Sequence, residues 1–214
     1  MKRRVLFLLI ISSLVYAAIT FVNHYNFRTY ALDLGYYTQV SQDWISGASP
    51  STAGFKSVAQ HSLSSHFDLS QIVFSPFVLL FGPWGLLFIQ WASILFGALG
   101  IYQWTQYHKS KYSLPILICF LSFFSVFQAL AYDYHSTVVA CMLLPWYFLS
   151  VAKGKIKLSW VLLISFALFR EDLALFAAFI AAGQVALYWK APDLKNQLLA
   201  QTTSMAALFL LIIL

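Results

Sequence analysis

The feature that most constrains this chain is a succession of long apolar runs separated by short clusters of basic residues. The first run covers residues 5–22 and follows a basic start at residues 1–4. As a helix rising about 1.5 Å per residue, a run of about 18 residues can cross a hydrocarbon core about 30 Å thick. Hydrophobic residues make up 61% of the chain and charged residues 9%, whereas soluble domains carry about 25% charged residues. The sequence therefore predicts an all-α polytopic membrane protein, a transmembrane helical bundle.

The clusters of Lys and Arg predict how the chain crosses the membrane. Basic residues favour the cytoplasmic side, so the N-terminus and the turns at 108–111, 153–157 and 190–195 are expected there. A cleaved signal peptide is the alternative for the first run. The predicted spans are residues 5–22, 84–107, 112–131, 136–152, 158–169, 173–189 and 198–214. They form a single transmembrane domain over residues 1–214, expected to be the N-terminal part of a longer module because the last run ends without a polar flank.

Residues 23–83 form a long first outer loop in this topology. Its tyrosines and tryptophans are spaced as in short helices that lie in the membrane interface. Residues 66–81 are also expected to be such a juxtamembrane helix. If they crossed the membrane instead, the basic turn at 108–111 would lie outside.

Several classes of function are excluded by the same composition. The net charge of +6 does not indicate nucleic-acid binding, because the basic residues lie in short clusters between apolar runs. Cys119 and Cys141 lie inside apolar runs and have no metal-binding spacing. The chain also has no Gly-rich phosphate loop.

The acidic residues gather on the predicted outer side. This is an independent observation, because the predicted topology depends only on the Lys and Arg residues. Arg170, Glu171 and Asp172 interrupt an apolar stretch. A charged residue deep in a bilayer costs roughly 2.5–3.5 kcal/mol, so these three should pair with one another or face a cavity. Arg170 can neutralise Glu171 or Asp172, or it can bind a phosphate. Six of the seven acids are predicted to lie outside: Asp33, Asp43, Asp68, Asp133, Glu171 and Asp172.

Asp33 is the acid with the most unusual setting. A helix over residues 33–45 would place it on one apolar face with Tyr37, Val40 and Trp44. The alternative is that Asp33 is only an N-cap. Alternatives also exist for the other outer motifs. Asp133 and His135 can belong to an interfacial aromatic belt, and His66 and Asp68 can simply begin a helix.

The order of these motifs resembles the DUF2079 family of uncharacterised prokaryotic membrane proteins, which is grouped with the GT-C glycosyltransferases. The resemblance extends over about residues 1 to 190. The motifs, in chain order, are Tyr30-Ala31-Leu32-Asp33-Leu34-Gly35, His66-Phe67 followed by Ser75-Pro76 before Phe81-Gly82-Pro83, Tyr132-Asp133-Tyr134-His135, and Arg170-Glu171-Asp172-Leu173.

This resemblance implies a GT-C-like bundle with juxtamembrane helices in the first outer loop. It implies transfer of a sugar from a polyprenyl-phosphate donor to an acceptor at the outer face of a prokaryotic plasma membrane. Asp33 matches the catalytic acid, which in GT-C enzymes is a base or a metal ligand, so a divalent cation such as Mg²⁺ or Mn²⁺ is a possible cofactor. The candidate substrate-binding residues are Arg170, Glu171, Asp172, Asp133, His135 and His66. The expected partners are the lipid-linked sugar donor and membrane lipids, without nucleic acid.

Two other functions are compatible with the same side chains. A transporter can couple transport to protonation of an acid pair, and a non-catalytic membrane scaffold can use the acids only as helix caps. A transporter predicts charges near the midplane of several spans. The charges here lie toward the outer ends of the spans, which favours an enzyme.

Overall fold

The chain folds into helices that run back and forth between two ends. A computed structural model describes residues 3–29, 31–50 and 61–214, and these residues contain no β-strand. The predicted outer loop is therefore described except for residue 30 and residues 51–60. The all-α fold class is confirmed. Four helical segments are long and apolar enough to cross a membrane: Arg3–Tyr25, Pro83–Tyr107, Ser113–Tyr132 and Pro192–Ile213.

Helices also occupy the other predicted ranges, but they are shorter. The stretch 136–152 is divided into α9 (Ser136–Cys141) and α10 (Leu144–Ala152), with Pro145 in the first turn of α10. Then follow α11 (Ile156–Ala167) and α12 (Glu171–Leu187). The long segments are α1 (Arg3–Ala17) continued by η1 (Ala18–Val22) and α2 (Asn23–Tyr25), α6 (Pro83–Tyr107), α7 (Ser113–Leu121) followed by α8 (Phe124–Tyr132), and α13 (Pro192–Ile213).

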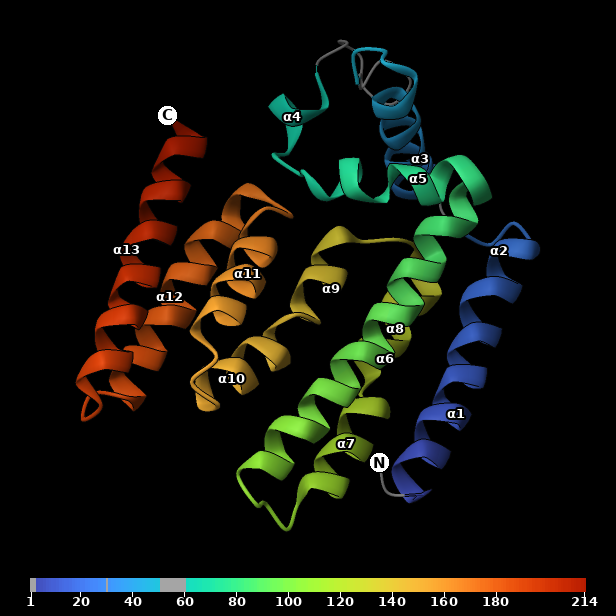
Figure 1. Cartoon of the computed structure of the whole chain (residues 1–214). Coiled ribbons are helices and arrows are strands. Elements are labelled where there is room, and N and C mark those ends of the chain that lie inside the picture. The colour runs from blue at the N-terminus through green and yellow to red at the C-terminus, as the bar shows by residue number, and fades with distance from the viewer. Residues whose placement is uncertain (1–2, 30, 51–60) are drawn as a thin grey trace.

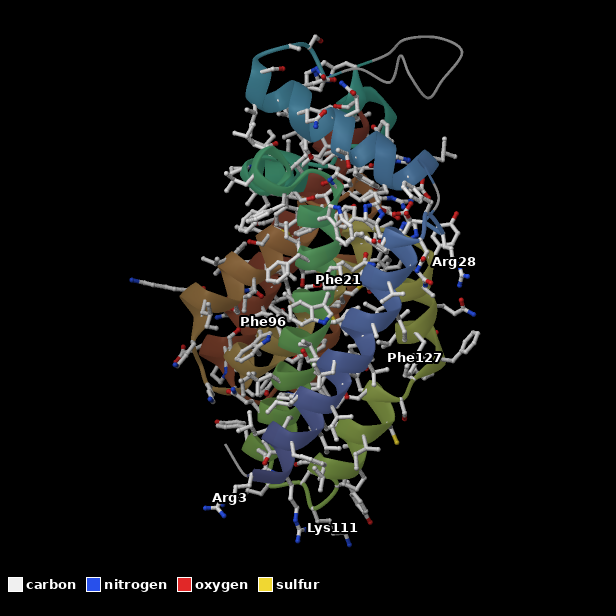
Figure 2. The ribbon with its side chains drawn as sticks, turned by 90° about the vertical axis from the view of Figure 1, so that its right-hand side faces the viewer. Arg3, Phe21, Arg28, Phe96, Lys111 and Phe127 are labelled. Carbon is white, nitrogen blue, oxygen red and sulfur yellow. The ribbon has the colours of Figure 1, made fainter. Side chains whose placement is uncertain are left out.

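Most basic residues and most acidic residues lie at or near opposite ends of this bundle, and Figure 1 shows which turns form each end. The N-terminus and the turns α6–α7, α10–α11 and α12–α13 lie at one end, here called the basic end, which includes Arg3 and Lys111 (Figure 2). Arg28 lies at the opposite end of the first helical segment (Figure 2). That opposite end holds the break between α8 and α9 and the turn between α11 and α12, and is here called the acidic end.

Two helices lie crosswise over the acidic end. They are α3 (Ala31–Ser46) and α5 (Ser70–Phe81), and the short α4 (Ser62–Ser65) lies between them in the sequence. Figures 1 and 2 together show both helices across the ends of the upright ones. The predicted helix 66–81 begins only at Ser70, because Asp68 accepts a hydrogen bond from the Ser70 N–H and starts the helix there. Residues 66–69 are therefore not helical.

One residue turns the chain from the crosswise α5 into the upright α6. Gly82 has φ of 58° and ψ of −143°, a conformation that a residue with a Cβ rarely adopts. Pro83 follows at the start of α6, where its missing N–H costs no helical hydrogen bond.

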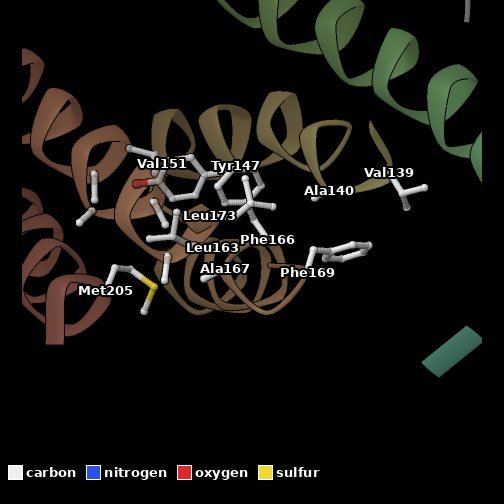
Figure 3. Packing of buried hydrophobic residues seen from close by; sticks show 14 of the residues in the cluster. Val139, Ala140, Tyr147, Val151, Leu163, Phe166, Ala167, Phe169, Leu173 and Met205 are labelled. Atoms are coloured by element: carbon white, nitrogen blue, oxygen red, sulfur yellow. The ribbon is translucent and has the colours of Figure 1, made fainter. Parts of the chain in front are cut away.

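Two apolar clusters fill the bundle, and α6 contributes to both. Leu86 and Leu87 belong to the cluster that contains α10 to α13, while Ile94 and Ala98 belong to the cluster with α1, α7 and α8. Figure 3 shows the first cluster, where Tyr147, Leu163 and Phe166 pack together. The two groups of helices therefore share one wall.

Close approach of α6 and α10 depends on a glycine. A Cβ on Gly100 would lie 2.7 Å from the Trp146 Nε1 atom, closer than van der Waals contact allows. Trp146 instead stacks on Phe96 and donates a hydrogen bond to the Phe96 carbonyl at 3.0 Å. Small residues allow this kind of packing between helices.

Candidate functional site

Asp133 joins the α8–α9 break to the crosswise helix α3. Its side chain is 1% exposed. Oδ2 accepts a hydrogen bond from the Leu34 N–H at 3.0 Å, and Oδ1 accepts one from the Tyr134 N–H at 2.7 Å. Leu34 lies in the first turn of α3, where N–H groups have no partner within the helix. Asp133 therefore caps α3 from a segment 99 residues away.

Asp33 lies in the first turn of α3, half-buried, and does not cap it. Among the described residues, no hydrogen bond or ion pair reaches the Asp33 carboxylate. The side chain that caps α3 is Asp133, so the N-cap alternative does not explain Asp33. Its charge nevertheless acts on two neighbours, because it raises the pKa values of both Asp133 and His135.

Burial has the largest effect on the pKa values of Asp133 and His135. Desolvation raises the pKa of Asp133 to about 6, although the N–H groups of Tyr134 and Leu34 act in the opposite direction. Burial also lowers the pKa of His135, and Asp33 opposes this shift. Asp33, Asp133 and His135 are therefore electrostatically coupled at the start of α3.

Gln90 of α6 holds the α8–α9 break in place. It is fully buried, and its Nε2 donates hydrogen bonds to the carbonyls of Asp133 at 2.7 Å and Ala129 at 2.9 Å. Its Oε1 accepts one from the His135 N–H at 2.7 Å. Gln90 was not predicted as a site residue, although an amide inside an apolar run indicates hydrogen bonding between spans.

Asp68 is the second deeply buried acid, and it was not among the predicted site residues. Its side chain is 2% exposed. Oδ1 accepts hydrogen bonds from the N–H and hydroxyl of Ser70. Oδ2 has no partner in hydrogen-bonding geometry, while the side chains of Ser136 and Gln71 still favour its charged form. Burial outweighs these contacts and raises the pKa of Asp68.

Tyrosines extend this buried polar layer between α3 and the α8–α9 break. The Tyr37 hydroxyl lies 3.4 Å from the Ser136 hydroxyl, and the Tyr37 ring packs edge-on against Tyr134 at 5.1 Å. Burial raises the pKa of Tyr37 to about 12. Asp68, Ser136 and these tyrosines thus connect the two groups of predicted site residues.

The second group lies at the turn between α11 and α12. Glu171 accepts a hydrogen bond from the Phe67 N–H at 3.0 Å, and its other oxygen lies 3.0 Å from His66 Nδ1. The Leu69 N–H donates to the Leu168 carbonyl at 3.0 Å. These contacts fasten residues 66–69, just before α5, to the α11–α12 turn.

Arg170 pairs with Asp172 in the same turn. Arg170 Nε and Asp172 Oδ1 lie 3.1 Å apart as an ion pair, without the alignment of a hydrogen bond. The side chains are 38% and 42% exposed. No contact among the described residues joins Arg170 to Asp33.

The structure therefore places all the predicted site residues at the acidic end, in two groups. One group contains Asp33, Asp133 and His135, and the other contains His66, Glu171, Arg170 and Asp172. In the described part of the chain, no three His, Cys, Asp or Glu side chains are grouped so that they could hold a metal ion. We therefore assign no residue to Mg²⁺ or Mn²⁺.

Two cavities adjoin these groups. The larger, about 860 Å³, lies beside α3 and is lined by neutral polar and aromatic side chains, including Gln39, Gln42 and Trp84. The smaller, about 380 Å³, lies between α5, α6, α9 and α11 and is almost entirely apolar. Ser70 and Phe169 line the smaller cavity, next in sequence to Leu69 and Arg170.

Comparison with known proteins identifies the family. A family profile described as "Predicted membrane protein (DUF2079)" matches residues 23–214. The chain belongs to the DUF2079 family. The match covers every candidate site residue and begins directly after residue 22, at the end of η1. No curated protein and no solved structure matches the chain.

Proposed function

We propose that this member of the DUF2079 family is a GT-C-type glycosyltransferase of the prokaryotic plasma membrane, which it crosses several times. It transfers a sugar from a polyprenyl-phosphate donor to an acceptor hydroxyl at the outer face. One observation carries the proposal. Acids from the first outer loop, the α8–α9 break and the α11–α12 turn gather at one end of the bundle, beneath two crosswise helices and beside an apolar cavity.

The apolar cavity and Arg170 supply complementary groups for a lipid phosphate. The cavity of about 380 Å³ is lined by side chains such as Val73, Phe74 and Leu143, which suit an isoprenoid chain. Phe169 lines it, and Arg170 is the next residue. A donor with its chain in this cavity would therefore bring its phosphate near a guanidinium, which can bind two phosphate oxygens. Binding would compete with the ion pair between Arg170 and Asp172.

The larger cavity suits a sugar. Its lining includes the Trp84 ring, the amides of Gln39 and Gln42, and the Thr38 hydroxyl, and the described lining residues include no Asp, Glu, Lys or Arg. Aromatic faces and neutral hydrogen-bonding groups match the apolar faces and hydroxyls of a carbohydrate. Leu34 also lines this cavity, and it directly follows Asp33 in the chain.

In the proposed reaction, Asp33 acts as the general base. The acceptor oxygen forms a bond to the anomeric carbon while the bond from that carbon to the phosphate oxygen breaks. The acceptor proton passes to the Asp33 carboxylate, and the bonding electrons leave with the lipid phosphate, beside Arg170. Asp133 is a positioning residue, because it holds the first turn of α3 through the Leu34 N–H.

The direct test is Asp33→Asn, assayed by transfer from a polyprenyl-phosphate sugar. We expect transfer to fall about 10²–10⁴-fold, the usual contribution of a general base. The melting profile should be unchanged, because no described residue hydrogen-bonds to the Asp33 carboxylate. Asp43→Asn is the matched control on the same helix, where Asp43 accepts a hydrogen bond from Gln39, and should keep its activity. Full activity of Asp33→Asn would disprove the role of Asp33.

A further inference from the structure

A third cavity lies at the basic end, opposite the candidate active site. Its volume is about 230 Å³, room for roughly seven waters at about 30 Å³ each. The start of α1, the last turns of α6 and the start of α7 form it, and these helices pack against one another. The lining residues are Arg4, Val5, Tyr102, Gln106, Ser110, Lys111, Ser113 and Leu114.

The polar groups of this cavity are suited to an anion. Arg4 and Lys111 bring two cations, and none of the described residues that line the cavity carries a carboxylate. In the described part of the chain neither cation belongs to an ion pair, and Lys111 Nζ lies 5.1 Å from the centre of the Tyr112 ring. Gln106 adds an amide and Ser110 adds a hydroxyl, and both groups can donate hydrogen bonds to phosphate oxygens.

The loop that carries Lys111 is held by its own hydrogen bonds. The Ser113 hydroxyl donates to the Ser110 carbonyl at 2.8 Å, and the Ser110 hydroxyl accepts from the Tyr112 N–H at 3.2 Å. Ser113 is also the first residue of α7, where the helix dipole favours negative charge. These bonds fix the backbone of the loop on which Lys111 lies, at the start of α7.

Apolar side chains continue from this cavity along the outside of the bundle. Leu6 and Phe7 on α1 are 46% and 62% exposed, and Ile116 on α7 is 38% exposed. These surfaces belong to helical segments long enough to cross a membrane. A ligand with a charged head and apolar chains would therefore place its head between Arg4 and Lys111 and its chains against α1 and α7.

We propose that this cavity binds the phosphate of an anionic phospholipid in the leaflet at the basic end. Such basic pockets between spans can recognise lipid head groups. The proposal does not depend on the transferase activity, because the site lies at the other end of the bundle. It differs from general attraction of a basic surface to anionic lipids, since it requires two specific cations.

The experiment measures binding of phosphatidylglycerol to the purified chain in detergent by native mass spectrometry. We compare the double variant Arg4→Gln/Lys111→Gln with the control Lys155→Gln/Lys157→Gln, which removes the same charge from exposed residues at the same end. At about fivefold per charge, the first variant should bind about 30-fold more weakly, and the control should stay within about twofold. The melting profiles of both should match the unchanged protein, because all four side chains are exposed.

Three outcomes would overturn the proposal. Equal weakening in the two double variants would show general surface attraction. Equal binding of phosphatidylcholine would show that the net charge of the lipid is not recognised. Displacement of phosphatidylglycerol by inorganic phosphate at equal concentration would show a site for the phosphate group alone.

Discussion

The two ends of the bundle handle charge in opposite ways. At the basic end, short turns carry exposed lysines such as Lys155 and Lys157, and cations there reach water on long flexible stems. At the acidic end, Asp133 and Asp68 are 1% and 2% exposed and depend on specific N–H and hydroxyl donors. Charge at the basic end can therefore orient the chain without fixing its tertiary contacts. Charge at the acidic end is part of the packing itself.

The connections differ in the same way. The α10–α11 turn is closed by local bonds such as Lys155 N–H to the Ser150 carbonyl at 2.8 Å. The acidic end is closed by bonds between distant segments, from Asp133 to Leu34 and from Glu171 to Phe67. The acidic end should therefore be sensitive to single substitutions, and the basic end tolerant of them.

The basic end is predicted to be cytoplasmic and the acidic end to face outward. The opposite orientation would contradict this contrast between the two ends. After replacement of Cys119 and Cys141 by Ser, we expect Ser46→Cys to react with a membrane-impermeant thiol reagent in intact cells and Lys155→Cys not to react. The reason is the sorting of Lys and Arg to the basic end. Both positions are exposed, and both should react after cell lysis. Labelling of Lys155→Cys alone in intact cells would reverse the topology.

Removal of the Asp133 carboxylate should have the largest effect on stability. Asp133→Ala leaves the buried N–H groups of Leu34 and Tyr134 without their acceptors. Each unpaired buried donor costs about 1–3 kcal/mol, so for two donors we expect a loss of about 2–6 kcal/mol in the free energy of unfolding. Denaturant unfolding of the purified protein in mild detergent measures it. Lys155→Ala is the control from the basic end, expected within about 0.5 kcal/mol. Equal losses would contradict the comparison.

The pH dependence of stability should also come from the acidic end. The folded-state pKa of Asp133 is about 6, above its ordinary value of 3.8, so the native state binds this proton more tightly than the unfolded state. The free energy of unfolding should therefore rise as the pH falls from about 7 to about 4, by about 1–3 kcal/mol. His135 opposes this trend because burial lowers its pKa, and Asp68 adds to it.

The contribution of Asp133 is isolated by comparison with Asp133→Asn. Melting temperatures across this pH range should rise less steeply toward acid in the variant. Parallel profiles for the two proteins would show that Asp133 does not titrate there.

The smallest effect is expected where the acidic end is most exposed. Glu171→Gln keeps an oxygen for the Phe67 N–H but loses the charge beside His66. Because the two side chains are 29% and 46% exposed, the expected loss is about 1 kcal/mol or less. Faster hydrogen exchange at the Phe67 and Leu69 amides would report the loosening of residues 66–69. Unchanged exchange would show that this pair does not fasten the segment.

Much of the helical layout could be predicted, because the length of an apolar run in the sequence indicates where its helix begins and ends. Helices occur at 83–107 and 113–132, within one residue of the predicted 84–107 and 112–131. The break in 136–152 was not predicted, although Pro145 could have indicated it. The start of α5 at Ser70 was also missed, because it depends on the side chain of Asp68.

The candidate site could be predicted only in part. The sequence indicated that most acids lie together at one end of the bundle, and it indicated that Arg170, Glu171 and Asp172 would need partners. It did not show that Glu171 takes its partners from residues 66 and 67 while Arg170 pairs with Asp172. Asp68 was expected among the outer acids but not as a site residue, and Gln90 was not predicted; both act through buried hydrogen bonds.

The sequence by itself therefore determined the class of protein, the positions of most helices and the separation of charge into two ends. These properties are sums over neighbouring residues, since apolar transfer free energy and the Lys/Arg bias accumulate along the chain. Only the tertiary structure decided that Asp133 caps α3, that α3 and α5 lie crosswise, and that the acids form two connected groups. A hydrogen bond needs its donor and acceptor about 3 Å apart, and for Leu34 and Asp133 that approach across 99 residues depends on how the whole bundle packs.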